Sequence, residues 1–167
     1  MRSVLVALVA CSIAAPSLAQ EPVGCDKFKW PLDRERAMLT AADVTGVASG
    51  GSVAQPPPFT VSVALVAFAD AKLPLPPERP PKSPQSFAGF VRVAAPPQAG
   101  TYKVTLSAAA WVDVVQAGRL IKSKAFSGAV GCAGIRKSVK FDLAAAPFTI
   151  EISGVAADAI RVALTGE

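Results

Sequence analysis

Histidine is absent from this sequence of 167 residues. Zinc sites of the usual imidazole kind, two-histidine iron sites and the Ser/His/Asp or Cys/His relays of nucleophilic catalysis all need at least one histidine side chain. The sequence also contains no GxGxxG, P-loop or CxxC motif, so dinucleotide, nucleotide and thioredoxin-like chemistries have no support. These absences exclude the histidine-dependent reaction classes, and we expect neither a cofactor nor a metal ion.

The first nineteen residues have the pattern of an export signal. Arg2 supplies a positive start, an apolar run extends from Val4 to Ala15, and Ser17-Leu18-Ala19 has the small residues that a signal peptidase accepts. This run is shorter than the ~20 apolar residues that span a bilayer. We therefore expect residues 1–19 to be removed, leaving a periplasmic or secreted protein that begins at Gln20 and has no transmembrane segment.

One alternative concerns the cysteine within this signal. Leu8-Val9-Ala10-Cys11 resembles the lipobox of bacterial lipoproteins, in which the cysteine is acylated and becomes the N-terminus. The protein would then be an envelope lipoprotein anchored through Cys11. The apolar stretch before this cysteine is short, so cleavage after Ala19 remains the primary expectation.

Cysteine is scarce as well, and its two positions after the signal are informative. Removal of nineteen residues from 167 leaves 148, and residues 20–167 match the size of one domain. Within them Cys25 and Cys132 form an even pair, which favours a disulfide in an oxidising compartment. Such a bond closes a loop of about a hundred residues and stabilises the fold by roughly 4–5 kcal/mol. The alternative is a reactive thiol, but no histidine is present to activate the sulfur.

Short runs of alternating apolar residues dominate the rest of the chain and predict β-strands. A helix is predicted only from Pro31 to Leu39. Seven or eight strands with so little helix favour an antiparallel β-sandwich, jelly-roll-like, with a short N-terminal helix. The predicted strands are Phe59 to Phe68, Phe87 to Ala94, Gly100 to Leu106, Trp111 to Gln116, Val139 to Leu143, Phe148 to Ile152 and Ile160 to Leu164.

The last three runs are expected to form a three-stranded meander, because only short turns separate them. In this arrangement Asp142 and Glu151 lie on the outward face, beside Lys140 and Arg161. We expect exposed cross-strand charge pairs there, each worth under about 1 kcal/mol.

Proline is concentrated between Leu73 and Pro84, where six of the twelve residues are proline. Such a segment favours extended polyproline II structure and has few backbone donors for a β-ladder. Its PxxP spacing matches peptide ligands of largely intracellular domains, which an exported protein would not meet. We therefore expect residues 73–84 to form a long, stiff surface loop.

The second half of the chain resembles PA14-like and related carbohydrate-binding β-sandwiches. The resemblance extends over residues 100–152, about a third of the chain, and rests on Gly100 to Leu106, Trp111 to Val114, Gly118 to Ile121, Val139 to Leu143 and Phe148 to Ile152. It implies a sandwich fold and binding to a glycan or to the cell envelope. Members that bind sugar through calcium use two adjacent aspartates. No Asp-Asp pair occurs here, so no ligand residues are carried over.

A basic stretch lies between Ala117 and Phe141 and contains no acidic residue. Its positive potential predicts an anionic partner such as lipid phosphate, acidic polysaccharide or a wall polymer. Nucleic acid is not expected, because aromatic residues are not interleaved as a stacking platform requires. The alternative is a solvated loop that keeps the domain soluble. The candidate residues are Arg119, Lys122, Lys124, Arg136, Lys137 and Lys140.

Trp111 and Asp113 form the second candidate feature. A tryptophan beside a carboxylate can line a sugar-binding face, with the ring stacked on a pyranose and the carboxylate accepting hydroxyl protons. The alternative is a core tryptophan with an aspartate at the rim. Two carboxylates could also act as the acid and base of a small glycan hydrolase. The sequence as a whole predicts an exported binding or structural module of the cell envelope, with the hydrolase and the acylated lipoprotein as alternatives.

Overall fold

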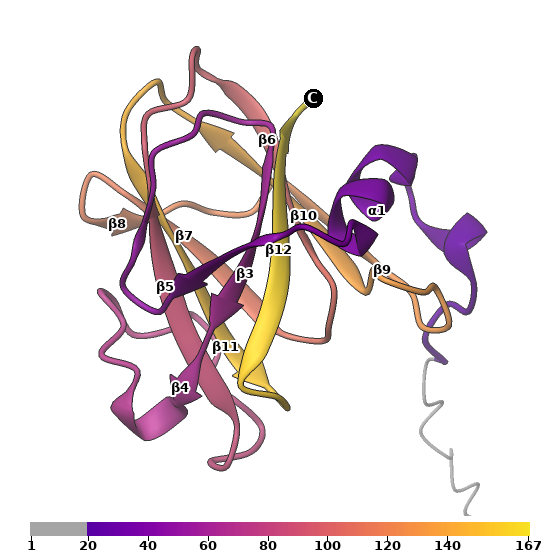
Figure 1. Cartoon of the computed structure of the whole chain (residues 1–167), viewed down its shortest axis with the longest axis horizontal. Coiled ribbons are helices and arrows are strands. Elements are labelled where there is room, and N and C mark those ends of the chain that lie inside the picture. Colours follow the sequence, from indigo (N-terminus) through magenta and orange to yellow (C-terminus); the bar gives the residue numbers. More distant parts are fainter. Residues whose placement is uncertain (1–19) are drawn as a thin grey trace, which may run out of the picture.

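The computed structural model describes residues 20–167. The predicted signal segment 1–19 and the lipobox cysteine Cys11 lie outside the described residues. Two β-sheets pack face to face, with one α-helix on the outside (Figure 1). This confirms the predicted β-sandwich. Across the described residues, no helix is both long and apolar enough to cross a membrane.

The first sheet has six strands in the order β1-β3-β12-β6-β10-β9. β1 pairs with β3 in parallel, and the other neighbours are antiparallel. The strands are β1 (Thr45–Ala48), β3 (Phe59–Ala64), β12 (Ala159–Gly166), β6 (Gly100–Leu106), β10 (Lys137–Leu143) and β9 (Ala125–Gly128).

The second sheet follows the order β2-β5-β11-β7-β8, with the short β4 also paired to β5. Its one parallel pair joins β2 to β5. The strands are β2 (Ser52–Val53), β5 (Phe87–Val93), β11 (Phe148–Val155), β7 (Trp111–Gln116), β8 (Arg119–Leu120) and β4 (Val66–Ala67). The 3-10 helices are η1 (Cys25–Lys27) and η2 (Phe68–Asp70), and residues 71–86 form neither helix nor strand.

The predicted meander is wrong. β10 and β12 belong to the first sheet and both pair with β6, whereas β11 lies in the second sheet between β5 and β7. The short connections on either side of β11 therefore cross from one sheet to the other. Alternation specifies which face of a strand is buried, but it carries no information about which strand lies beside it.

The surroundings of the four charged residues assigned to that meander change accordingly. Asp142 is exposed as expected, but its ion-pair partner is Lys124. Lys140 pairs with Glu167, and Arg161 donates to the backbone oxygens of residues 39 and 41 at 2.8 Å. Glu151 is only 2% exposed, so the prediction of a surface charge pair there is wrong.

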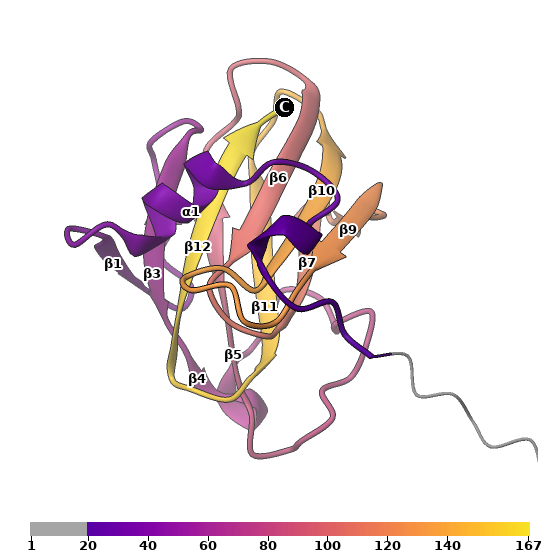
Figure 2. The same ribbon diagram turned by 90° about the vertical axis from the view of Figure 1, so that its right-hand side faces the viewer.

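The predicted helix is confirmed as α1 (Asp33–Thr40), which begins two residues after Pro31. It lies on the outer face of the first sheet against β12 and β3, and Figure 2 shows the N-terminal arm crossing this face. Leu32 and Leu39 pack there with Ile135 in a small second core. The predicted disulfide joins Cys25 to Cys132 and ties the start of the arm to the loop before β10.

The main core lies between the sheets and follows the alternation of the strands. In β7, Val112 and Val114 point into the core, so Trp111 and Asp113 lie on the opposite face of the second sheet. In β11 the isoleucines point inward, and Glu151 shares the outer face with its cross-strand partner Asp113.

Candidate functional site

Two buried carboxylates lie side by side on the outer face of the second sheet. Asp113 in β7 and Glu151 in β11 are direct cross-strand partners and are 6% and 2% exposed. Directly opposed residues in an antiparallel pair have Cβ atoms about 4.5–5.5 Å apart. Two acidic side chains at this separation repel each other when both are ionised, so their burial needs a compensating interaction.

The proline-rich segment supplies that interaction by covering the outer face (magenta, lower left in Figure 1). Between residues 74 and 81 the only residues with a backbone N–H are Leu75, Glu78 and Arg79, because the other five are proline. The N–H of Leu75 donates to Glu151 Oε1 at 2.9 Å, and the N–H of Glu78 donates to Asp113 Oδ2 at 3.1 Å. The two carboxylates therefore hold the segment through two of its three available donors.

The pKa values of these carboxyls reflect their burial. Burial raises the pKa of Asp113, although hydrogen bonds from Trp111 and Glu78 oppose the shift. Burial also raises the pKa of Glu151; the Leu75 N–H opposes this shift, and the charge of Asp113 adds to it. Glu151 Oε2 has no hydrogen-bond partner among residues 20–167.

Trp111 connects this carboxylate pair to two cations. Its indole Nε1–H donates to Asp113 Oδ1 at 2.8 Å. The guanidinium carbon of Arg79 and the Lys137 ammonium each lie 4.7 Å from the centroid of the Trp111 ring, within cation–π range. Arg79 belongs to the proline-rich segment and Lys137 to β10 in the opposite sheet, so the ring lies where three parts of the chain meet.

Lys137 is partly buried and lacks an acidic partner in the part of the chain that the structure describes. Its ammonium donates to the backbone oxygen of Ala110 at 3.1 Å, and no carboxylate lies within ion-pair distance of it. Burial lowers the pKa of Lys137, and the positive charge of Arg79 lowers it further, with Asp113 opposing the shift. The site therefore holds an incompletely compensated positive charge.

These residues border a cleft of about 880 Å³, which we call the Trp111 cleft. Its walls come from both sheets, from the proline-rich segment and from the loop after β8. Charged side chains and the Trp111 ring border the cleft, and the main core contributes only side chains that are almost fully buried. The lining residues include Arg79, Trp111, Asp113, Ile121, Phe126, Arg136 and Lys137, together with the buried Val112, Val139, Phe141 and Ser153.

The structure brings together only part of the predicted basic stretch. Arg136 and Lys137 line the Trp111 cleft with Trp111 and Asp113, and Arg136 also pairs with Glu21 at 2.7 Å. The remaining four basic residues do not line the cleft: three lie in β8 or in the loop after it, and Lys140 lies on the face of β10 opposite Lys137. These four are Arg119, Lys122, Lys124 and Lys140, of which the first three are exposed.

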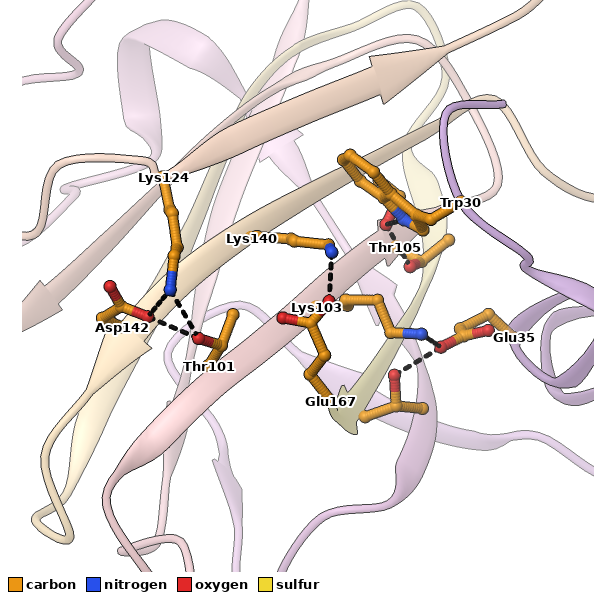
Figure 3. Close-up of polar contacts among 11 residues, drawn as sticks. Trp30, Glu35, Thr101, Lys103, Thr105, Lys124, Lys140, Asp142 and Glu167 are labelled. Carbon is orange, nitrogen blue, oxygen red and sulfur yellow. Dashed lines mark hydrogen bonds and ion pairs between the residues drawn. The ribbon is translucent and has the colours of Figure 1, made fainter. Parts of the chain in front are cut away.

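Lys124 and Lys140 instead join a polar network on the outer face of the first sheet (Figure 3). Lys124 Nζ lies 3.0 Å from both Asp142 Oδ1 and Thr101 Oγ1. Lys140 pairs with Glu167 and lies 4.4 Å from the centroid of the Trp30 ring. Both cations already have acidic partners, which makes them weaker candidates for an external anion.

The same network anchors α1 through Glu35, which is 1% exposed. Its Oε1 lies 2.6 Å from Lys103 Nζ and accepts a 2.5 Å hydrogen bond from the Thr165 hydroxyl (Figure 3). Burial alone would raise the pKa of Glu35, but the hydrogen bonds and the charge of Lys103 outweigh it and lower that pKa. This contact holds the helix on the sheet.

Sequence reasoning missed three contributors to the cleft region. Arg79 was hidden in a segment interpreted as a stiff loop, Glu151 was assigned to the surface, and Ser153 had no recognisable motif. One signal was available: a segment with only three N–H donors needs acceptors wherever it is held against a sheet. That requirement points to buried acidic or carbonyl partners, although it does not identify them.

Comparisons with models of protein families, with curated proteins and with solved structures found no match. Residues 20–167 contain no group of three or more acidic, cysteine or histidine side chains that could hold a metal ion. A function for this chain must therefore be inferred from the chemistry of its own residues at the Trp111 cleft.

Proposed function

We propose that the protein is an exported binding module of the cell envelope that holds an anionic ligand at the Trp111 cleft. The observation that carries this proposal is the convergence of Arg79 and Lys137 on the Trp111 ring without an acidic ion-pair partner for either among the described residues. A partly buried ammonium is costly unless a negative group compensates it. An anion bound there would provide that compensation, with Arg136 close by at the same opening.

The two cations beside the Trp111 ring favour an anion over a neutral sugar as the ligand. Stacking on a pyranose requires a free ring face, and two cations already lie 4.7 Å from the centroid of this ring. Asp113 has both carboxylate oxygens engaged, by Trp111 and by Glu78, so it is poorly placed to accept sugar hydroxyls. The resemblance to PA14-like modules is the reason to keep neutral glycans among the ligands tested.

Export is supported by two features. The signal-like segment 1–19 precedes the domain, and the Cys25–Cys132 disulfide is typical of oxidising compartments. Envelope polymers outside the cytoplasm carry phosphate and carboxylate groups that could pair with Arg79 and Lys137 beside the Trp111 ring. Acylation of Cys11 would place the same cleft at a membrane surface and would not change its chemistry.

The hydrolase alternative gains no support from the geometry. Of the two buried carboxylates, only Asp113 lines the cleft. Glu151 accepts the N–H of Leu75 beneath the proline-rich segment, and both oxygens of Asp113 are already engaged. A glycosidase needs an acid and a base that both reach the scissile bond, and so we do not propose this activity.

The test is co-sedimentation of the mature protein with peptidoglycan, lipopolysaccharide and a neutral polysaccharide, at low and at moderate salt. Retention on the anionic polymers should weaken with salt and should fall at least tenfold in a variant carrying Arg79→Gln and Lys137→Gln. The matched control carries Arg119→Gln and Lys122→Gln, which removes the same charge from exposed positions outside the cleft.

Three results would contradict the proposal. Retention that is equal on the neutral polysaccharide would favour a sugar-binding face. An equal loss of retention in the control variant would assign binding to general surface charge. Absence of retention on every polymer would mean that no envelope polymer is the ligand.

A further inference from the structure

A carboxylate of the chain itself already occupies part of the Trp111 cleft. Residues 20–22 line the cleft, and both carboxylate oxygens of Glu21 lie 2.7 Å from Arg136 Nη2. Two further cations, Arg79 and Lys137, lie beside the ring in the same cleft and have no acidic ion-pair partner among residues 20–167. The protein's own anion therefore compensates Arg136 and leaves the other two cations to an external one.

The segment that carries Glu21 is held beside the cleft (indigo in Figure 2). The backbone of residues 22–24 exchanges two hydrogen bonds with Val130, at 2.8 and 2.9 Å. Cys25 follows directly and forms the disulfide with Cys132. A group tethered over so short a distance meets its partner at an effective concentration of about millimolar. An external anion therefore has to compete with this carboxylate for the same guanidinium.

The pair between Glu21 and Arg136 is nevertheless exchangeable. The Glu21 side chain is 62% exposed and the Arg136 side chain 23% exposed. Ion pairs between solvent-accessible side chains are weak and are screened by salt. A ligand anion can therefore replace the Glu21 carboxylate without breaking a buried contact, and the displaced carboxylate is hydrated.

This exchange favours a ligand with more than one anionic group. A ligand with a single group has only Arg79 and Lys137 open to it, because replacing Glu21 at Arg136 exchanges one carboxylate contact for another of the same kind. A second group on the same ligand adds the Arg136 contact to those beside Trp111. Once the first group is bound, the second is also held at a high effective concentration and can displace the tethered carboxylate.

We propose that Glu21 is an autoinhibitory competitor at the Trp111 cleft, and that the ligand is a polyanion. One anionic group of the ligand replaces Glu21 at Arg136, and another contacts Arg79 and Lys137. This inference rests on the proposed function, because it specifies the valence of the anion and the regulation of the same site. The internal carboxylate thereby discriminates against small anions that carry one charge.

The test is isothermal titration calorimetry of the mature protein with three sugars of increasing charge. Maltotriose is neutral, galacturonate carries one carboxylate and trigalacturonate carries three. Trigalacturonate should bind at least about tenfold more tightly than galacturonate, because only the trimer reaches both groups of cations. Maltotriose should give no binding heat.

Glu21→Gln should tighten trigalacturonate by about three- to fivefold, the range expected for removal of a partly exposed ion pair. The matched control is Asp26→Asn, which removes the same charge from the same arm. Asp26 pairs with the neighbouring Lys27 and does not line the Trp111 cleft, so affinity should be unchanged in this variant. In an Arg136→Gln background, Glu21→Gln should no longer tighten binding.

The outcomes separate this inference from the proposed function. Equal tightening in Glu21→Gln and Asp26→Asn would overturn the inference and leave the proposed function standing. So would galacturonate binding as tightly as trigalacturonate, or tightening by Glu21→Gln that persists in the Arg136→Gln background. Absence of trigalacturonate binding both to the unmodified protein and to Glu21→Gln would also overturn the inference; salt-sensitive retention on lipopolysaccharide would then still support the proposed function.

Discussion

The hydrogen bond between the Leu75 N–H and Glu151 can be tested at a single amide. Among residues 20–167 this 2.9 Å contact is the only hydrogen bond that the N–H donates, and its acceptor is a carboxylate of a residue that is 2% exposed. Replacing Glu151 by alanine removes the acceptor. The Leu75 amide should then exchange with solvent much faster than it does in the unmodified protein.

The size of the effect follows from the type of bond. Hydrogen bonds to charged groups contribute about 1.5–3 kcal/mol, and each 1.4 kcal/mol is a tenfold change in an equilibrium. If the segment opens locally before exchange, exchange at Leu75 should accelerate about 10- to 150-fold in Glu151→Ala. Global stability should change less, because the variant also removes a buried charge whose Oε2 lacks a hydrogen-bond partner among the described residues.

The assay is residue-resolved hydrogen exchange by NMR on the ¹⁵N-labelled protein. Glu151→Gln is the matched control, since its amide oxygen can still accept from Leu75, and exchange should be intermediate. Amides of β12 serve as an internal reference for global unfolding. Unchanged exchange at Leu75 in Glu151→Ala, or an equal acceleration at Leu75 and throughout β12, would refute a local anchoring role for this carboxylate.

Three further predictions concern stability. Replacing Cys25 and Cys132 by serine should lower stability by about 4–5 kcal/mol for a sequence separation of 107, and the melting temperature by about 8–20 °C in calorimetry. Folding lowers the pKa of Glu35, so this carboxylate stabilises the fold at neutral pH and loses that effect as the pH falls below the ordinary value of 4.5. In Glu35→Gln, the free energy of unfolding measured with urea should therefore fall less steeply toward acid pH. Folding raises the pKa values of Asp113 and Glu151, so the folded protein still binds protons that the unfolded chain has released. The free energy of unfolding should therefore fall as the pH rises above the ordinary values of 3.8 for Asp113 and 4.5 for Glu151. The double variant Asp113→Asn with Glu151→Gln should remove this fall.

Each of these has a clear contradicting result. A melting temperature that changes by less than about 2 °C without the disulfide would mean that the unfolded chain is already compact around the cysteines. An unaltered acid limb in Glu35→Gln would remove the Lys103 contact as a source of stability. A pH profile of the double carboxylate variant that parallels the unmodified protein would mean that other groups set the pH dependence.

Much of the fold could be predicted from the sequence because each strand has a local pattern of alternating apolar and polar residues. Alternation in Gly100 to Leu106 and Phe148 to Ile152, with turn residues between runs, located the strands, and the sandwich was confirmed. The neighbours of β11 could not be predicted in the same way. β11 pairs with β5 and β7, which are far from it in the sequence, and the local alternation pattern does not indicate which strands pair.

The candidate site was predicted in part for the same reason. Trp111 and Asp113 lie two residues apart in one strand, so their local spacing revealed them together. Arg79 joins them only because the proline-rich segment folds across the second sheet, and Glu151 is buried only because β11 changes sheet. Long-range contacts thus created both the covering of the carboxylates and the pairing of Arg79 with the Trp111 ring.

The central claim is that an anion binds beside Trp111, and the emission of this residue reports on it directly. The chain has two tryptophans, so Trp30→Phe leaves Trp111 as the only one. Titration of this variant with lipopolysaccharide at low salt should change the Trp111 emission saturably, and the change should weaken at moderate salt. Adding Arg79→Gln and Lys137→Gln should abolish it. An equal change with a neutral polysaccharide, or binding of lipopolysaccharide that leaves Trp111 emission unaltered, would contradict the account.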